Sequence, residues 1–152
     1  MNWNLKTLYK SEKDPQIQKD ILLSKKANAS FVTKWSKNKK YLQDPKVLLQ
    51  AIQEYEKLEE TYGQCQKPLY YLSLRSYLNQ KDPVIKGMLN KLSETATKMA
   101  NNIQFFELNI SKIPKEKQTK FLSYKGLANY KHYLERLFLV GKYLLSDNEE
   151  KI

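Results

Sequence analysis

Residues 82–114 read DPVIKGMLNKLSETATKMANNIQFFELNISKIP, and this stretch decides the fold class. Apolar residues recur in it every three or four positions, which is the period of one face of an α-helix. The stripe comprises Ile85, Met88, Leu89, Leu92, Ala96, Met99, Ile103, Phe106, Ile110 and Ile113. An aspartate and a proline open the stretch and Pro114 closes it, so the pattern predicts one long helix over residues 83–113, ~45 Å in length.

Asp-Pro pairs mark three helix starts along the chain, because aspartate is a good N-cap and proline suits the first helical position. These pairs are Asp14-Pro15, Asp44-Pro45 and Asp82-Pro83. Further amphipathic segments follow Pro68 and Pro114 and cover residues 129–145. With short links and no Gly-rich linker, the sequence predicts an all-α fold. We expect an antiparallel helical bundle or array of about five to six helices, in a single domain over residues 1–152.

The last residues predict the start of another helix. Ser146 and Glu149 have the spacing of a capping box, and Asp147 and Glu150 add negative charge in the first turn. A helix this short is unstable alone in water. A helix start without a helix body therefore needs an explanation.

The net charge of +11 raises the question of a nucleic-acid partner. Of the 27 basic residues only Arg75 and Arg136 are arginines, the side chain that recognises phosphates and bases in bidentate fashion. The densest basic patch, KWSKNKKY at Lys34–Tyr41, is interpreted first as a solvated link between helices. The single cysteine, Cys65, and the absence of a signal-like N-terminus favour the cytoplasm, and no apolar run is long enough for a bilayer.

Candidate catalytic residues are few. The one histidine, His132, cannot form a H-E-x-x-H zinc site and is interpreted as a partly exposed helix residue beside Glu135 and Arg136. Cys65 could be a nucleophile only with a lowered pKa, and it is interpreted as a thiol at a helix junction. The acidic group Glu54, Glu56, Glu59 and Glu60 is interpreted as helix-face charge pairing, and the tyrosines of residues 69–79 as packing residues. We therefore expect no catalytic, cofactor-binding or metal-binding residues in this chain.

Six segments, in order, resemble the N-terminal region of oligoendopeptidase F, a zinc metallopeptidase of the thimet oligopeptidase-like group. They are WNLKTLYKSEKDP (Trp3–Pro15), LLQAIQEYEKL (Leu48–Leu58), YYLSLRSYLNQKDP (Tyr70–Pro83), IQFFELNISKIP (Ile103–Pro114), YKHYLERL (Tyr130–Leu137) and LLSDNEEKI (Leu144–Ile152). The resemblance implies a non-catalytic helical region that covers a catalytic domain and walls a cavity admitting peptides. It also implies that zinc and the H-E-x-x-H motif lie downstream in the full-length enzyme.

Two hypotheses follow. In the first, the chain is inactive alone, its partners are the missing catalytic domain and, in the full-length enzyme, peptide substrates, and the isolated chain self-associates. No nucleic acid or membrane is expected as a partner. In the second, the chain is a stand-alone basic helical module that binds RNA, a membrane surface or a protein partner.

Overall fold

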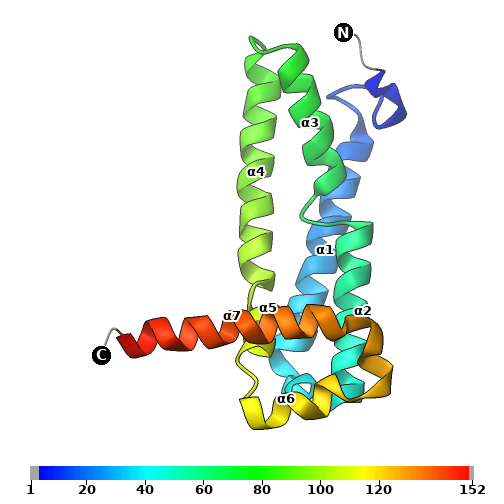
Figure 1. Cartoon of the computed structure of the whole chain (residues 1–152). Coiled ribbons are helices and arrows are strands. Elements are labelled where there is room, and N and C mark those ends of the chain that lie inside the picture. The colour runs from blue at the N-terminus through cyan, green and yellow to red at the C-terminus, as the bar shows by residue number, and fades with distance from the viewer. Residues whose placement is uncertain (1–3, 151–152) are drawn as a thin grey trace. The chain divides into compact units, whose positions relative to one another are not determined.

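The computed structural model describes residues 4–150, with side chains through residue 144 (Figure 1). Within these residues the chain forms helices and loops without a strand. The α-helices are α1 (Pro15–Lys37), α2 (Pro45–Thr61), α3 (Gln66–Leu78), α4 (Pro83–Ile103), α5 (Phe105–Ser111), α6 (Lys115–Leu122) and α7 (Lys131–Glu150). Short 3-10 helices are η1 (Leu5–Thr7), η2 (Lys39–Leu42) and η3 (Lys125–Tyr130). The all-α prediction is confirmed.

All three Asp-Pro pairs begin helices as predicted. The side chain of Asp14 accepts a hydrogen bond from the backbone N–H of Gln16 at 2.9 Å. Asp44 accepts from Lys46, and Asp82 from Val84, both at 2.9 Å. Each carboxylate therefore satisfies an N–H that the first helical turn leaves without a partner.

The predicted single helix over residues 83–113 is wrong in one respect, because it is divided at Gln104 into α4 and α5. The apolar stripe is buried on both sides of this break. Its two parts enter different cores: Met99 lies 3.6 Å from Cys65, sulfur to sulfur, whereas the Phe106 ring packs against Tyr41 at 5.3 Å between centroids. We attribute the break to these two packing environments, since neither proline nor glycine is present there.

The predicted helix start at Ser146 is also wrong. The backbone of α7 runs without interruption from Lys131 to Glu150, so Ser146 lies inside a helix that begins fifteen residues earlier in the sequence. A capping serine must itself leave the helical conformation. The strong helix formers Leu144 and Leu145 precede it, and they favour continuation instead.

The chain divides into two compact units, and each unit is built from two separate segments. Unit 1 comprises Met1–Phe31 and Lys57–Asn102, and unit 2 comprises Val32–Glu56 and Ile103–Ile152. The boundaries fall inside α1, α2 and α4. The expectation of a single domain over residues 1–152 stays a prediction.

Unit 1 has its own apolar core. The core collects buried side chains from the N-terminal segment, α1, α3 and α4, together with the residue before α3. They are Tyr9, Ile17, Ile21, Cys65, Tyr71, Leu72, Leu92 and Met99. Tyr9 and Tyr71 meet edge to face, with ring centroids 5.1 Å apart, a favourable aromatic geometry.

Unit 2 has an aromatic core. The Trp35 and Tyr41 rings pack edge to face at 5.7 Å, and Phe106 lies 5.1 Å from Tyr55. The helix α7, orange to red in Figure 1, meets α5 closely at Gly141. A Cβ atom at that position would overlap the backbone carbonyl of Ser111, so only glycine allows this approach.

Candidate functional site

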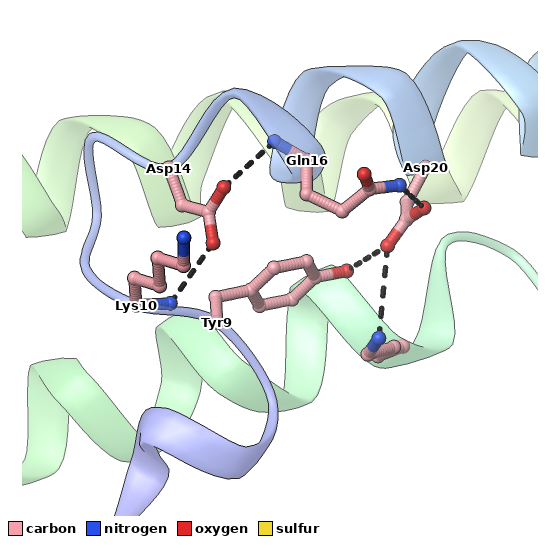
Figure 2. Close-up of polar contacts among 6 residues, drawn as sticks. Tyr9, Lys10, Asp14, Gln16 and Asp20 are labelled. Carbon is pink, nitrogen blue, oxygen red and sulfur yellow. Dashed lines mark hydrogen bonds and ion pairs between the residues drawn. The ribbon is translucent and has the colours of Figure 1, made fainter.

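The N-terminal segment is held against α1 by a buried tyrosine (Figure 2). The Tyr9 hydroxyl donates to Asp20 Oδ2 at 2.5 Å, and the Gln16 amide donates to Asp20 Oδ1 at 2.8 Å. The Lys67 ammonium lies 3.9 Å from the same carboxylate and 4.7 Å from the Tyr9 ring centroid. Burial, followed by the hydrogen bond and the charge of Asp20, raises the pKa of Tyr9, so this hydroxyl stays protonated.

Asp14 fixes the turn between this segment and α1. Its two carboxylate oxygens accept from the backbone N–H groups of Lys10 and Gln16, each at 2.9 Å (Figure 2). These hydrogen bonds lower the pKa of Asp14. Residues 9–16 are therefore positioned by side-chain contacts in addition to the helix that follows them.

A hollow of about 190 Å³ lies beside this segment, and we call it the N-terminal hollow. Its lining comes from residues 4–12 and from α3, and it comprises Asn4, Leu5, Lys6, Tyr9, Lys10, Ser11, Glu12, Tyr71, Arg75 and Leu78. Arg75 Nη2 donates to Glu12 Oε2 at 3.1 Å. The buried Arg75 Nε has no hydrogen-bond partner among the described residues. Sequence reasoning missed this site, because its two halves are more than fifty residues apart in the chain.

His132, the one histidine, lies on the surface of α7. Its side chain is fully exposed, and Nδ1 lies 3.8 Å from Glu135 Oε2, one helical turn away. The interpretation of His132 as an exposed helix residue agrees with this placement.

Cys65 is buried rather than presented to a substrate. Its backbone has the left-handed conformation, with φ of 58°, and its N–H donates to Ser24 Oγ at 3.1 Å. Burial raises the pKa of the thiol, against the opposing influence of Ser24. A buried thiol with a raised pKa is a poor nucleophile at neutral pH.

The four glutamates of α2 do not converge. Glu54 accepts from Lys34 at 2.7 Å, from Trp35 at 2.8 Å and from Gln50 at 3.2 Å. Burial opposes ionisation of Glu54, but these hydrogen bonds outweigh it and lower its pKa. Glu56, in unit 2, accepts from Tyr130, whereas Glu59, in unit 1, accepts from the Gln64 amide.

The basic patch at Lys34–Tyr41 does not offer its aromatic rings to a ligand. Trp35 and Tyr41 are 1% and 0% exposed, and both belong to the core of unit 2. Lys34 is paired with Glu54 and lies 4.9 Å from the Trp35 ring centroid. Base stacking would require exposed rings, so this patch presents charge alone.

The tyrosines of α3 are divided between core and surface. Tyr71 is 2% exposed and packs in unit 1, whereas Tyr70 and Tyr77 are 59% and 67% exposed. The packing interpretation of these residues therefore describes Tyr71, whereas Tyr70 and Tyr77 leave most of their surface exposed. Of the three, only Tyr71 lines the N-terminal hollow.

The described residues do not fit a zinc site. A structural or catalytic zinc needs three or four converging His, Cys or carboxylate ligands. Among residues whose side chains are described, no group of three such residues is arranged to hold a metal. The histidine is exposed beside one glutamate, and the cysteine contacts a methionine sulfur.

The middle of α7 carries large apolar side chains on the surface as well as in the core. Leu137 and Phe138 are buried, but Leu139, Val140, Tyr143 and Leu144 are 53%, 47%, 64% and 40% exposed. We call these four residues the α7 apolar face. A helix segment that is apolar all round is normally covered. None of the described helices combines the length and apolarity that crossing a bilayer requires.

The sequence of this helical chain is similar to that of a class of peptidases. A family model described as Oligopeptidase F matches residues 109–152, which include α6 and α7. Two curated relatives match the whole chain at 27% identity over 157 residues: "Oligoendopeptidase F, plasmid" from Lactococcus lactis subsp. cremoris and "Oligoendopeptidase F homolog" from Lactococcus lactis subsp. lactis (strain IL1403). The chain spans 24% of the length of each relative. No solved structure matches it.

These matches confirm the resemblance to the N-terminal region of oligoendopeptidase F that the sequence indicates. The similarity covers 100% of this chain. The α7 apolar face falls inside the segment that the family model matches.

Proposed function

We propose that this chain is the non-catalytic N-terminal helical region of an oligoendopeptidase F-like zinc metallopeptidase, and that it walls the cavity in which peptides are hydrolysed. The similarity over the whole chain to relatives of which it spans 24% supports this. In this proposal zinc and the H-E-x-x-H motif belong to a downstream catalytic part of the full-length enzyme, and the substrates are peptides. We also propose a cytoplasmic location, with which the free thiol of Cys65 is consistent.

The structural observation that carries the proposal is the α7 apolar face. Leu139 and Tyr143 are more than half exposed, although the opposite side of α7 is already buried against α5. An exposed patch of this kind marks a surface that another part of a protein covers. We propose that the catalytic part of the same peptidase covers it, and that the isolated chain self-associates through it.

The proposal is tested first by extending the reading frame past Ile152 and then by measuring peptide hydrolysis. We expect the frame to continue into H-E-x-x-H. In that complete enzyme, the double substitution Leu139→Lys and Val140→Lys should lower kcat/KM for a bradykinin-like peptide about tenfold or more. The physical reason is that two buried ammonium groups would disrupt the covered interface.

The control is the pair Leu22→Lys and Leu23→Lys, which replaces two similarly exposed leucines on α1. This control should leave kcat/KM within about twofold of the parent. A stop codon directly after Ile152, or equal losses in the two double variants, would contradict the proposal. The isolated chain should hydrolyse no peptide when zinc is supplied.

A further inference from the structure

The N-terminal hollow has the composition of a small anion site. Lys6, Lys10 and Arg75 contribute three cationic side chains to its lining, and Glu12 contributes one carboxylate. The balance is therefore positive, and the cations come from two elements of unit 1 that fold against each other. Such a concave arrangement of one charge sign concentrates ligands of the opposite sign.

Arg75 has donors that the described residues do not use. Its guanidinium carries five N–H donors, and the bond from Nη2 to Glu12, at 3.1 Å, engages one of them. Nε is buried and has no partner among the described residues. Arg75 therefore keeps hydrogen-bonding capacity beyond its contact with Glu12.

The remaining walls restrict what kind of group could use this capacity. Tyr9 and Tyr71 present an edge-to-face aromatic pair, and Leu5 and Leu78 add aliphatic surface. At about 190 Å³ the hollow is smaller than the ~300–1,000 Å³ of sites for drug-sized molecules. It therefore suits one amino-acid-sized group with an apolar body and an acidic end.

A carboxylate fits this hollow better than a phosphate does. A guanidinium matches the planar carboxylate through parallel N–H donors. A phosphate monoester carries about −1.5 to −2 charge at neutral pH, whereas a carboxylate carries one negative charge. The Glu12 carboxylate in the wall therefore repels a phosphate more strongly than it repels a carboxylate ligand. The aromatic and aliphatic walls likewise favour an organic acid over an inorganic ion.

We propose that the N-terminal hollow binds the carboxylate of an amino-acid-sized apolar group, with Arg75 as the principal donor and Lys6 and Lys10 as supporting charges. The group is either a free acylated amino acid or the C-terminal residue of a peptide. This inference stands on the hollow alone and does not depend on the proposed peptidase function.

The test is a 15N–1H NMR titration of the chain with N-acetyl-leucine, and separately with N-acetyl-leucinamide, its neutral counterpart. We expect amide shifts confined to residues 5–12 and 71–78, with a Kd of roughly millimolar for the acid. The amide should bind at least about tenfold more weakly, because it lacks the charge. Titration with acetyl-Ala-Leu then tells a peptide C-terminus from a free acylated amino acid.

Variants separate a built site from general positive charge. Arg75→Lys keeps the charge but loses the planar fork, and it should weaken binding about tenfold. Lys6→Gln with Lys10→Gln changes only exposed side chains, so it tests the proposal even if the Arg75 variant fails to fold. It should weaken binding about threefold or more. The matched control, Lys81→Gln with Lys86→Gln, removes two exposed lysines outside the hollow.

Three results would overturn the proposal. Equal affinity for N-acetyl-leucine and N-acetyl-leucinamide would show that the hollow does not recognise the negative charge of the carboxylate. Equal weakening by the control pair would show that binding follows net charge alone. Tighter binding of inorganic phosphate than of N-acetyl-leucine would assign the hollow to a different ligand class.

Discussion

At the scale of single residues, two helical glycines have opposite surroundings. In α7, a Cβ on Gly141 would overlap the backbone carbonyl of Ser111, and the backbone there cannot move aside as a flexible side chain could. In α4, a Cβ on Gly87 would meet nothing within 4 Å. Gly141 is therefore required by close packing, whereas Gly87 only adds conformational freedom to the unfolded chain.

We predict opposite effects for the same substitution at these two sites. Gly141→Ala should lower the free energy of unfolding by about 1–3 kcal/mol, because α5 and α7 must separate to admit the methyl group. Gly87→Ala should raise it by about 0.5–1 kcal/mol through the better helix propensity of alanine. Urea denaturation followed by circular dichroism measures both. A stabilised Gly141→Ala variant would show that α5 and α7 can separate without loss of packing.

At the scale of elements, single substitutions at the Asp-Pro pairs test how much each N-cap stabilises its helix. Asp82→Ala removes the oxygen that accepts from Val84, so α4 should lose about 0.5–2 kcal/mol of stability. Asp82→Asn keeps an oxygen in the same place and should retain most of it. Thermal unfolding of the two variants compares them directly. Equal losses would mean that charge at the helix start, rather than the cap, stabilises α4.

Helix starts were predictable because their signals are local. An aspartate, a proline and the next few residues contain all the atoms that form each cap. The division at Gln104 was not predictable, because the apolar period continues through it unchanged. What separates α4 from α5 is the choice of packing partner, and Tyr41 lies more than sixty residues from Phe106 in the sequence.

The candidate sites show the same limit. The placement of His132 and the failure of the α2 glutamates to converge follow from helix geometry and composition. The N-terminal hollow needs Glu12 and Arg75 to meet across the fold of unit 1, and nothing near either residue indicates the other. The α7 apolar face was visible as an apolar run, but only a structure shows which of its side chains stay in water.

At the scale of the whole molecule, buried tyrosines in both units make the stability depend on alkaline pH. Burial raises the pKa of Tyr9 and Tyr71 in unit 1 and of Tyr41 in unit 2. The folded protein therefore keeps protons that the unfolded chain releases near pH 10. The resulting stability is present below about pH 10 and is lost as the pH rises above it.

We predict a steep fall in the free energy of unfolding from about pH 10 upward, with a shallower fall in the Tyr9→Phe variant, which lacks one of these protons. Tyr70→Phe is the control, because it removes the same hydroxyl from an exposed tyrosine of unit 1. Guanidinium titrations at about pH 8 through 11 measure the slopes. A slope that Tyr9→Phe does not alter would mean that the Tyr9 hydroxyl ionises as readily in the folded protein as in water.

The interleaving of the two units has a consequence for how the protein is made. Trp35, Tyr41 and Leu48 are synthesised within the first third of the chain, but Phe106 and Ile110, which belong to the same unit, are synthesised more than fifty residues later. During that interval all residues of unit 1 are synthesised, whereas the aromatic side chains of unit 2 still lack the residues that they pack against. Nascent chains of this protein therefore pass through a stage in which large apolar rings are available to chaperones, and synthesis beyond residue 110 ends that stage.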